Sequence, residues 1–71
     1  MSAPYASAAM RDQFLAALDT NDHALSTRLA KNLTGCANPL PGMICQQLEL
    51  PNGSTYGSAA QRVLSMYPES Q

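Results

Sequence analysis

His23 is the single histidine of the chain, and two carboxylates, Asp19 and Asp22, lie close to it in the sequence. A carboxylate beside an imidazole can orient a general base, and such clusters can also bind metals. No second acid–base group lies near them in the sequence, however. A histidine one residue into a helix, beside capping carboxylates, is typical of a solvated surface. We therefore predict no catalytic residue here.

Residues 53–57 read Gly-Ser-Thr-Tyr-Gly and match the outline of a Gly-x-Ser-x-Gly nucleophile elbow, with Thr55 in the place of the nucleophile. That elbow joins a strand to a helix within an α/β sheet. A chain of 71 residues without strand-forming segments provides no such sheet. The same residues suit the capped start of a helix, whose free N–H groups favour anions. The segment lacks the lysine of a phosphate loop, so we favour a helix cap.

Cys36 and Cys45 are the only cysteines of the chain. Together with one histidine they do not supply the four ligands of a zinc site, so we predict no metal and no cofactor. Two interpretations remain for the pair: buried reduced thiols, or a disulfide that closes the 36–45 loop. Reduced thiols are favoured for a cytoplasmic chain, and the spacing alone does not decide between the two.

The charges argue against nucleic-acid and membrane partners. The net charge is −1, and the four basic residues, Arg11, Arg28, Lys31 and Arg62, form no run and no stripe. Nucleic-acid-binding proteins usually cluster such residues, and membrane-surface helices carry them on one face.

No apolar run approaches the ~20 residues of a spanning helix. The start of the chain does not resemble a secretory signal, and the initial Met favours a cytoplasmic location.

The composition predicts an all-α fold. Ala, Leu and Met dominate the apolar residues, whereas the chain has a single Val and a single Ile. Helices favour the first group and strands the β-branched residues. Apolar periodicity and turn residues place four helices at about 4–18, 22–34, 41–49 and 55–67. We expect one small domain over residues 1–71, a compact bundle of three to four short helices, with frayed ends at about 1–3 and 68–71.

Local signals refine these helices. Pro4 suits a first helical turn, Asp22 or Asn21 and Thr55 or Ser54 suit N-caps, and Gly35 is expected to be left-handed after the second helix. The periodic apolar positions give a predicted core. Its members are Phe14, Leu18, Leu25, Leu29, Leu48, Val63 and Leu64.

The chain is expected to be no enzyme but a protein–protein interaction module, such as a small inhibitor, adaptor or effector-type domain. It would bind another protein, or itself, through the third and fourth helices. Large apolar and aromatic side chains dominate binding energy, and Arg would be their charged neighbour. The predicted partner-binding residues are Met43, Tyr56, Arg62, Met66 and Tyr67. The alternative is a helix-turn-helix DNA-binding regulator over residues 43–67, which the scarcity of cations opposes.

Overall fold

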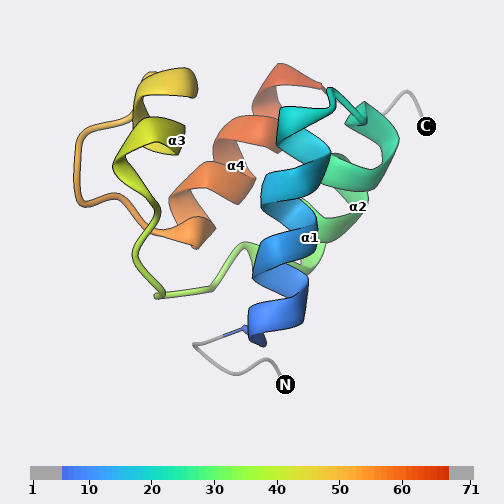
Figure 1. Cartoon of the computed structure of the whole chain (residues 1–71), viewed down its shortest axis with the longest axis horizontal. Coiled ribbons are helices and arrows are strands. Elements are labelled where there is room, and N and C mark those ends of the chain that lie inside the picture. The colour runs from blue at the N-terminus through green and yellow to red at the C-terminus, as the bar shows by residue number, and fades with distance from the viewer. Residues whose placement is uncertain (1–5, 68–71) are drawn as a thin grey trace.

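The computed structural model describes residues 6–67, which form four helices: α1 (Ala8–Asp19), α2 (His23–Leu33), α3 (Gly42–Gln47) and α4 (Tyr56–Met66) (Figure 1). The predicted all-α fold is therefore confirmed. The bounds of α2, α3 and α4 differ from the predicted ranges by one or two residues at each end. The ends expected to fray, about 1–3 and 68–71, lie outside the described residues.

The first helix begins later than the sequence predicts. Ser7 has an extended backbone (φ −66°, ψ 154°), and its hydroxyl accepts a hydrogen bond from the Met10 N–H at 3.1 Å. This N-cap satisfies one of the free donors of the first turn. The Ala6 N–H instead donates to the side chain of Asn38 at 3.1 Å. The predicted start at Pro4 is wrong because this segment is tied to the 36–40 loop; Pro4 itself lies outside the described residues.

A tight connection joins α1 to α2. Asn21 adopts a left-handed conformation with φ 57°, which lets the Asp22 N–H donate to the Ala17 carbonyl at 2.8 Å. This bond closes the end of α1 in the manner of a Schellman motif. The Asp22 carboxylate then accepts from the Leu25 N–H at 3.1 Å and caps α2, as predicted.

The end of α2 departs from expectation. Thr34 is right-handed (φ −61°, ψ −26°), and Gly53 (φ 89°) is the only glycine of the described residues with a positive φ. The prediction of a left-handed Gly35 is thus wrong. The chain leaves α2 through a turn in which the Cys36 N–H donates to the Leu33 carbonyl at 2.9 Å. Because this turn follows a right-handed Thr34, the end of α2 does not require a left-handed backbone at Gly35.

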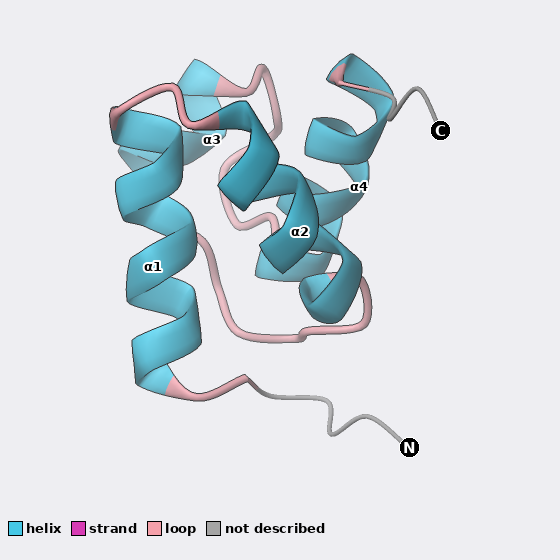
Figure 2. Ribbon diagram, turned by 90° about the vertical axis from the view of Figure 1, so that its right-hand side faces the viewer, coloured by secondary structure: helices cyan, strands magenta, loops and turns pink. Residues whose placement is uncertain are grey.

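The core forms around α2, which lies between α1 and α4 (Figure 2). Of the predicted core residues, Phe14, Leu18, Leu29, Leu48 and Val63 are buried, whereas Leu25 and Leu64 are half-buried. The radius of gyration is 10.9 Å, close to the ~11 Å of a compact chain of this length. Four short helices therefore share a single interior.

Hydrogen bonds join the chain segment before α3 to the segment after it. The Leu40 N–H donates to the Ser54 carbonyl at 2.8 Å, and the Tyr56 N–H donates to the Asn38 carbonyl at 2.9 Å. These bonds bring the two chain segments that flank α3 side by side. Buried Cys45 and Leu48 attach α3 to the core.

Both cysteines are buried free thiols, as the favoured interpretation expects. The Cys36 Sγ lies 3.1 Å from the Asn38 side-chain oxygen. The Cys45 Sγ lies 4.0 Å from the Leu40 carbonyl.

Candidate functional site

Three helices end and one begins at the same end of the molecule. Helices α1, α3 and α4 run toward the top of Figure 1, and α2 starts there and runs back. Their termini surround a cavity of about 160 Å³, which we call the helix-end cavity. Its lining consists of Ala17, Leu18, Asn21, His23, Ser26, Gln47, Leu48, Met66 and Tyr67.

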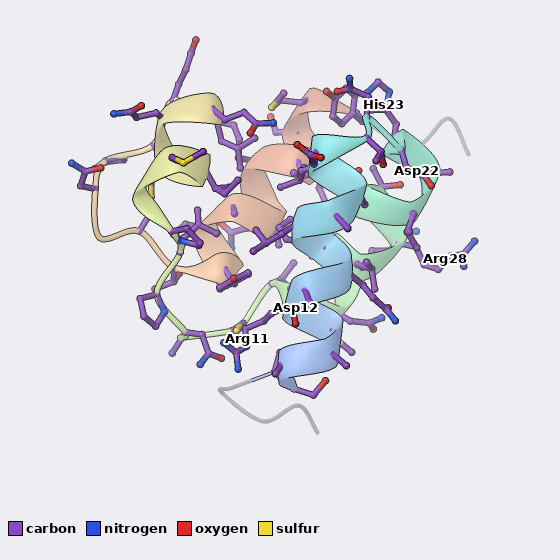
Figure 3. All side chains as sticks on the ribbon, in the orientation of Figure 1. Arg11, Asp12, Asp22, His23 and Arg28 are labelled. Atoms are coloured by element: carbon purple, nitrogen blue, oxygen red, sulfur yellow. The ribbon has the colours of Figure 1, made fainter. Side chains whose placement is uncertain are left out.

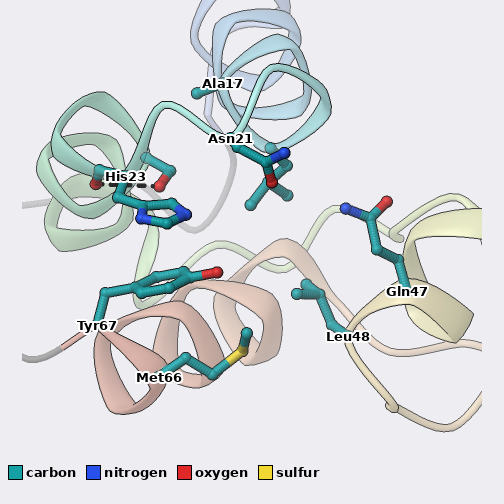
Figure 4. A pocket seen from close by; sticks show the side chains of 9 residues that line it. Ala17, Asn21, His23, Gln47, Leu48, Met66 and Tyr67 are labelled. Carbon is teal, nitrogen blue, oxygen red and sulfur yellow. Dashed lines mark hydrogen bonds between the residues drawn. The ribbon is translucent and has the colours of Figure 1, made fainter.

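The helix-end cavity combines apolar walls with neutral polar groups. Leu48 and Met66 contribute apolar surface together with the end of α1. In Figure 4 the amide groups of Asn21 and Gln47 face one another, and the Tyr67 hydroxyl points inward. Amide groups both donate and accept hydrogen bonds. The cavity can therefore hold an apolar group and bond the polar atoms beside it.

An aromatic stack closes one side of the helix-end cavity. The rings of His23 and Tyr67 lie face to face, with their centroids 4.0 Å apart and their planes at 19° (Figure 4). His23 belongs to the first turn of α2 and Tyr67 follows the last turn of α4. The stack thus joins two elements that are far apart in the sequence, and it shapes the wall of the cavity.

Ser26 and His23 lie in the same cavity but do not form a nucleophile–base pair in this geometry. The Ser26 hydroxyl donates to the backbone carbonyl of His23 at 3.1 Å. An activated serine would bond the imidazole instead. Within residues 6–67, no three His, Cys, Asp or Glu side chains gather in a way that could hold a metal ion.

The size of the helix-end cavity limits its occupant. Cavities for drug-sized ligands and cofactors usually measure about 300–1,000 Å³. A volume of about 160 Å³ is closer to a cavity of roughly 150 Å³ that holds one benzene. This space fits one aliphatic or aromatic side chain rather than a cofactor.

Met66 and Tyr67, two of the predicted partner-binding residues, are brought together at this cavity. Met66 is 45% exposed and Tyr67 is half-buried. Methionine adapts its shape to different contacts, and tyrosine joins an apolar ring to a polar tip. The two side chains therefore remain accessible to a partner.

Arg62 lies beside the helix-end cavity but holds α3 in place. Its Nε donates to the Leu48 carbonyl at 3.1 Å, and its Nη2 donates to the Glu49 carbonyl at 3.3 Å. A neighbouring hollow of about 190 Å³ includes Arg62, Glu49, Gln47, Leu48 and Met66. The guanidinium thus caps the carbonyl end of α3, where the partial negative charge of the helix dipole attracts a cation.

Tyr56 and Met43 are not part of this site. Tyr56 is 4% exposed; its ring centroid lies 6.3 Å from that of Phe14, and the Arg11 guanidinium lies 5.9 Å from it. Its ring therefore packs in the interior. Met43 is 80% exposed in the first turn of α3, away from the end that borders the cavity. Of the five predicted residues, the structure gathers Met66, Tyr67 and, at the edge, Arg62.

Sequence reasoning missed Asn21, Ser26 and Gln47 as cavity residues. They belong to the ends of separate helices, and no periodicity links them. The capping signal at residues 21–22 marked a helix boundary but not a binding surface. Only the packing of four termini at one place brings these side chains together.

Within residues 6–67, no helix is long and apolar enough to cross a membrane. The chain was compared with protein-family models, with curated proteins and with solved structures, and it has no significant match in any of the three.

Proposed function

We propose that this chain is a non-catalytic protein-interaction module that receives one apolar or aromatic side chain of a partner in the helix-end cavity. The observation that carries the proposal is the cavity itself, about 160 Å³ in volume and walled by Leu48 and Met66. Side chains that fill such pockets dominate the binding energy of many interfaces. We call the partner side chain that enters the cavity the anchor.

The polar groups at the opening support the same proposal. A buried anchor brings its own backbone N–H and C=O groups to the edge of the cavity, and these groups need hydrogen-bond partners. The amides of Asn21 and Gln47 stand there and can both donate and accept (Figure 4). A small molecule without such groups would leave these amides unused.

The DNA-binding alternative has less support. Residues 48–55 separate α3 from α4, whereas the turn of a helix-turn-helix has roughly three to four residues. Arg62, the one cation of α4, has its guanidinium engaged with two carbonyls. A recognition helix needs side chains that reach bases and phosphates. For the location, we propose the cytoplasm, where the buried thiols of Cys36 and Cys45 would stay reduced.

The proposal is tested by comparing proteins captured from source-cell extract on immobilised wild type, Met66→Gln and Met43→Gln. Both replaced methionines are exposed, but only Met66 lines the helix-end cavity. We expect a partner that quantitative mass spectrometry finds with wild type and Met43→Gln but not with Met66→Gln. A partner lost only with Met43→Gln would place the binding surface at the start of α3 instead. Equal capture by all three would contradict a role for either methionine.

A further inference from the structure

The end of the molecule that holds the helix-end cavity is acidic. Asp19 ends α1, Asp22 precedes α2 and Glu49 follows α3, and all three side chains are exposed. Among residues 6–67 these are three of the four acidic side chains. Arg62 borders Glu49 at this end, and its guanidinium is engaged with carbonyls. In Figure 3, Asp22 lies at this end of the molecule, whereas Arg11 and Asp12 lie at the other.

The helix dipoles add to the negative electrostatic potential that these acidic side chains create. The carbonyl end of a helix carries a partial negative charge, and its amide end a partial positive charge. The carbonyl ends of α1, α3 and α4 surround the cavity, against the single amide end of α2, and Arg62 already binds the carbonyl end of α3. Asp22 accepts a hydrogen bond from that amide end. The surroundings of the apolar cavity therefore favour positive charge.

We infer that the occupant of the helix-end cavity is a basic segment of another protein, in which Lys or Arg residues flank the anchor. This inference rests on the proposed function and names its partner class. The anchor fills the space between Leu48 and Met66. The flanking cations pair with Glu49 on one side and with Asp19 or Asp22 on the other. Such complementary charges raise the association rate and select the partner.

A second copy of this chain does not suit the same cavity. A two-fold symmetric contact through this end would place the same acidic surface on both sides of the interface. Like charges facing each other disfavour such a pair. The charge pattern therefore selects a basic partner over self-association at this surface.

Three short peptides of equal length test the inference. The first has a central Leu flanked by two Lys on each side, the second replaces every Lys by Glu, and the third replaces the Leu of the first by Gly. Each peptide is titrated into the ¹⁵N-labelled chain and followed by the amide shifts of Gln47, Leu48 and Met66. We expect the first peptide to bind about tenfold more tightly than either of the others, and its affinity to weaken as salt screens the charges.

Matched variants separate charge from fold. The double variant Asp19→Asn with Glu49→Gln should lower the affinity of the first peptide about three- to tenfold, whereas Asp12→Asn, exposed nearer the start of α1, should leave it unchanged. The inference would be overturned if the double variant and Asp12→Asn changed the affinity equally. It would also be overturned if about 1 mM of the first peptide shifted none of these amide signals.

The result also separates the inference from the proposed function. If the Glu-flanked peptide binds at the same amides at least as tightly, the cavity takes an anchor but not a basic segment. Only the inference then fails. If the Lys-flanked peptide shifts amides elsewhere and binds Met66→Gln as well as wild type, both fail.

Discussion

Glu49 holds a left-handed backbone with φ 59°, a conformation that costs a residue with a Cβ about 1–2 kcal/mol. Asn21 has the equivalent role at the end of α1, and asparagine tolerates this region better. At α3 the turn lets the Leu50 N–H donate to the Cys45 carbonyl at 2.7 Å. Arg62 further donates to the Glu49 carbonyl. These bonds offset the strain, and they leave the glutamate side chain at the edge of the candidate site.

Replacing Glu49 by glycine should therefore stabilise the fold. Glycine adopts positive φ without the steric penalty but loses more backbone entropy on folding. We expect Glu49→Gly to raise the free energy of unfolding by about 1 kcal/mol in urea denaturation. Gln47→Gly, in the last turn of α3, is the control and should lower it by about 1 kcal/mol. A Glu49→Gly variant that is less stable than wild type would show that the left-handed backbone of Glu49 does not destabilise the fold.

Tyr56 predicts a pH dependence of stability. Burial raises the pKa of its phenol above the ordinary value, and the nearby positive charge of Arg11 opposes that rise. The folded state thus holds the phenol proton more tightly than the unfolded state does. The stabilisation from this group is complete below about pH 10 and is lost as the pH rises through the folded pKa.

We expect the free energy of unfolding to fall above about pH 10, and to fall less steeply in Tyr56→Phe, which keeps the ring but has no phenol proton. Denaturation at several alkaline pH values measures both slopes. Identical slopes would show that Tyr56 does not titrate differently in the folded state.

At the scale of elements, the join between α2 and α4 depends on Gly57. The Gly57 N–H donates to the Cys36 carbonyl at 3.0 Å, and a Cβ at this position would lie 2.8 Å from the Thr34 carbonyl oxygen and 2.9 Å from that of Cys36. Both neighbours are backbone atoms and move little. The glycine of the Gly-Ser-Thr-Tyr-Gly stretch thus permits a close approach of two segments rather than a catalytic turn.

Gly57→Ala should lower the free energy of unfolding by about 1–3 kcal/mol because the added methyl overpacks this contact. Gly42→Ala, also in a first helical turn, is the matched control. Its Cβ would meet only the Asn52 side chain at 3.9 Å, so alanine should be neutral or slightly stabilising. Thermal unfolding of both variants measures the difference. Equal melting temperatures would show that a methyl group at residue 57 does not overpack the contact.

The caps of these elements were readable in the sequence. Asp22 caps α2, and the Thr55 hydroxyl accepts from the Ser58 N–H at 3.2 Å to cap α4. Capping is local, because the bond joins residues three apart, so residue type and position reveal it. The start of α1 was not readable, since the bond from Ala6 to Asn38 joins distant segments.

At the scale of the whole molecule, stability depends on one small core. Leu29 is 7% exposed on the face of α2 that meets this core, whereas Leu25, one turn earlier, is half-buried. Leu29→Ala should lower the free energy of unfolding by about 2–5 kcal/mol through lost burial and a cavity. Leu25→Ala should lower it less, because more of its side chain already contacts water. Urea denaturation of the two variants measures the difference; an equal loss would place both leucines at the same depth.

The sequence by itself determined the fold class, three of the four helix starts and part of the core, including Phe14, Leu29 and Val63. Helical periodicity and capping act over three or four residues, and the apolar spacing of Phe14, Leu29 and Val63 marks the faces that must be buried. These signals need no knowledge of how the helices pack.

Only the tertiary structure decided where the candidate site lies. Asn21, Gln47, Leu48 and Met66 come from the ends of three helices, and they meet because α1, α3 and α4 end at one place. The same packing buried Tyr56 and engaged Arg62 with α3. A residue's availability depends on what covers it, and the covering groups come from distant parts of the chain. Local sequence patterns therefore located the helices but not the cavity between their ends.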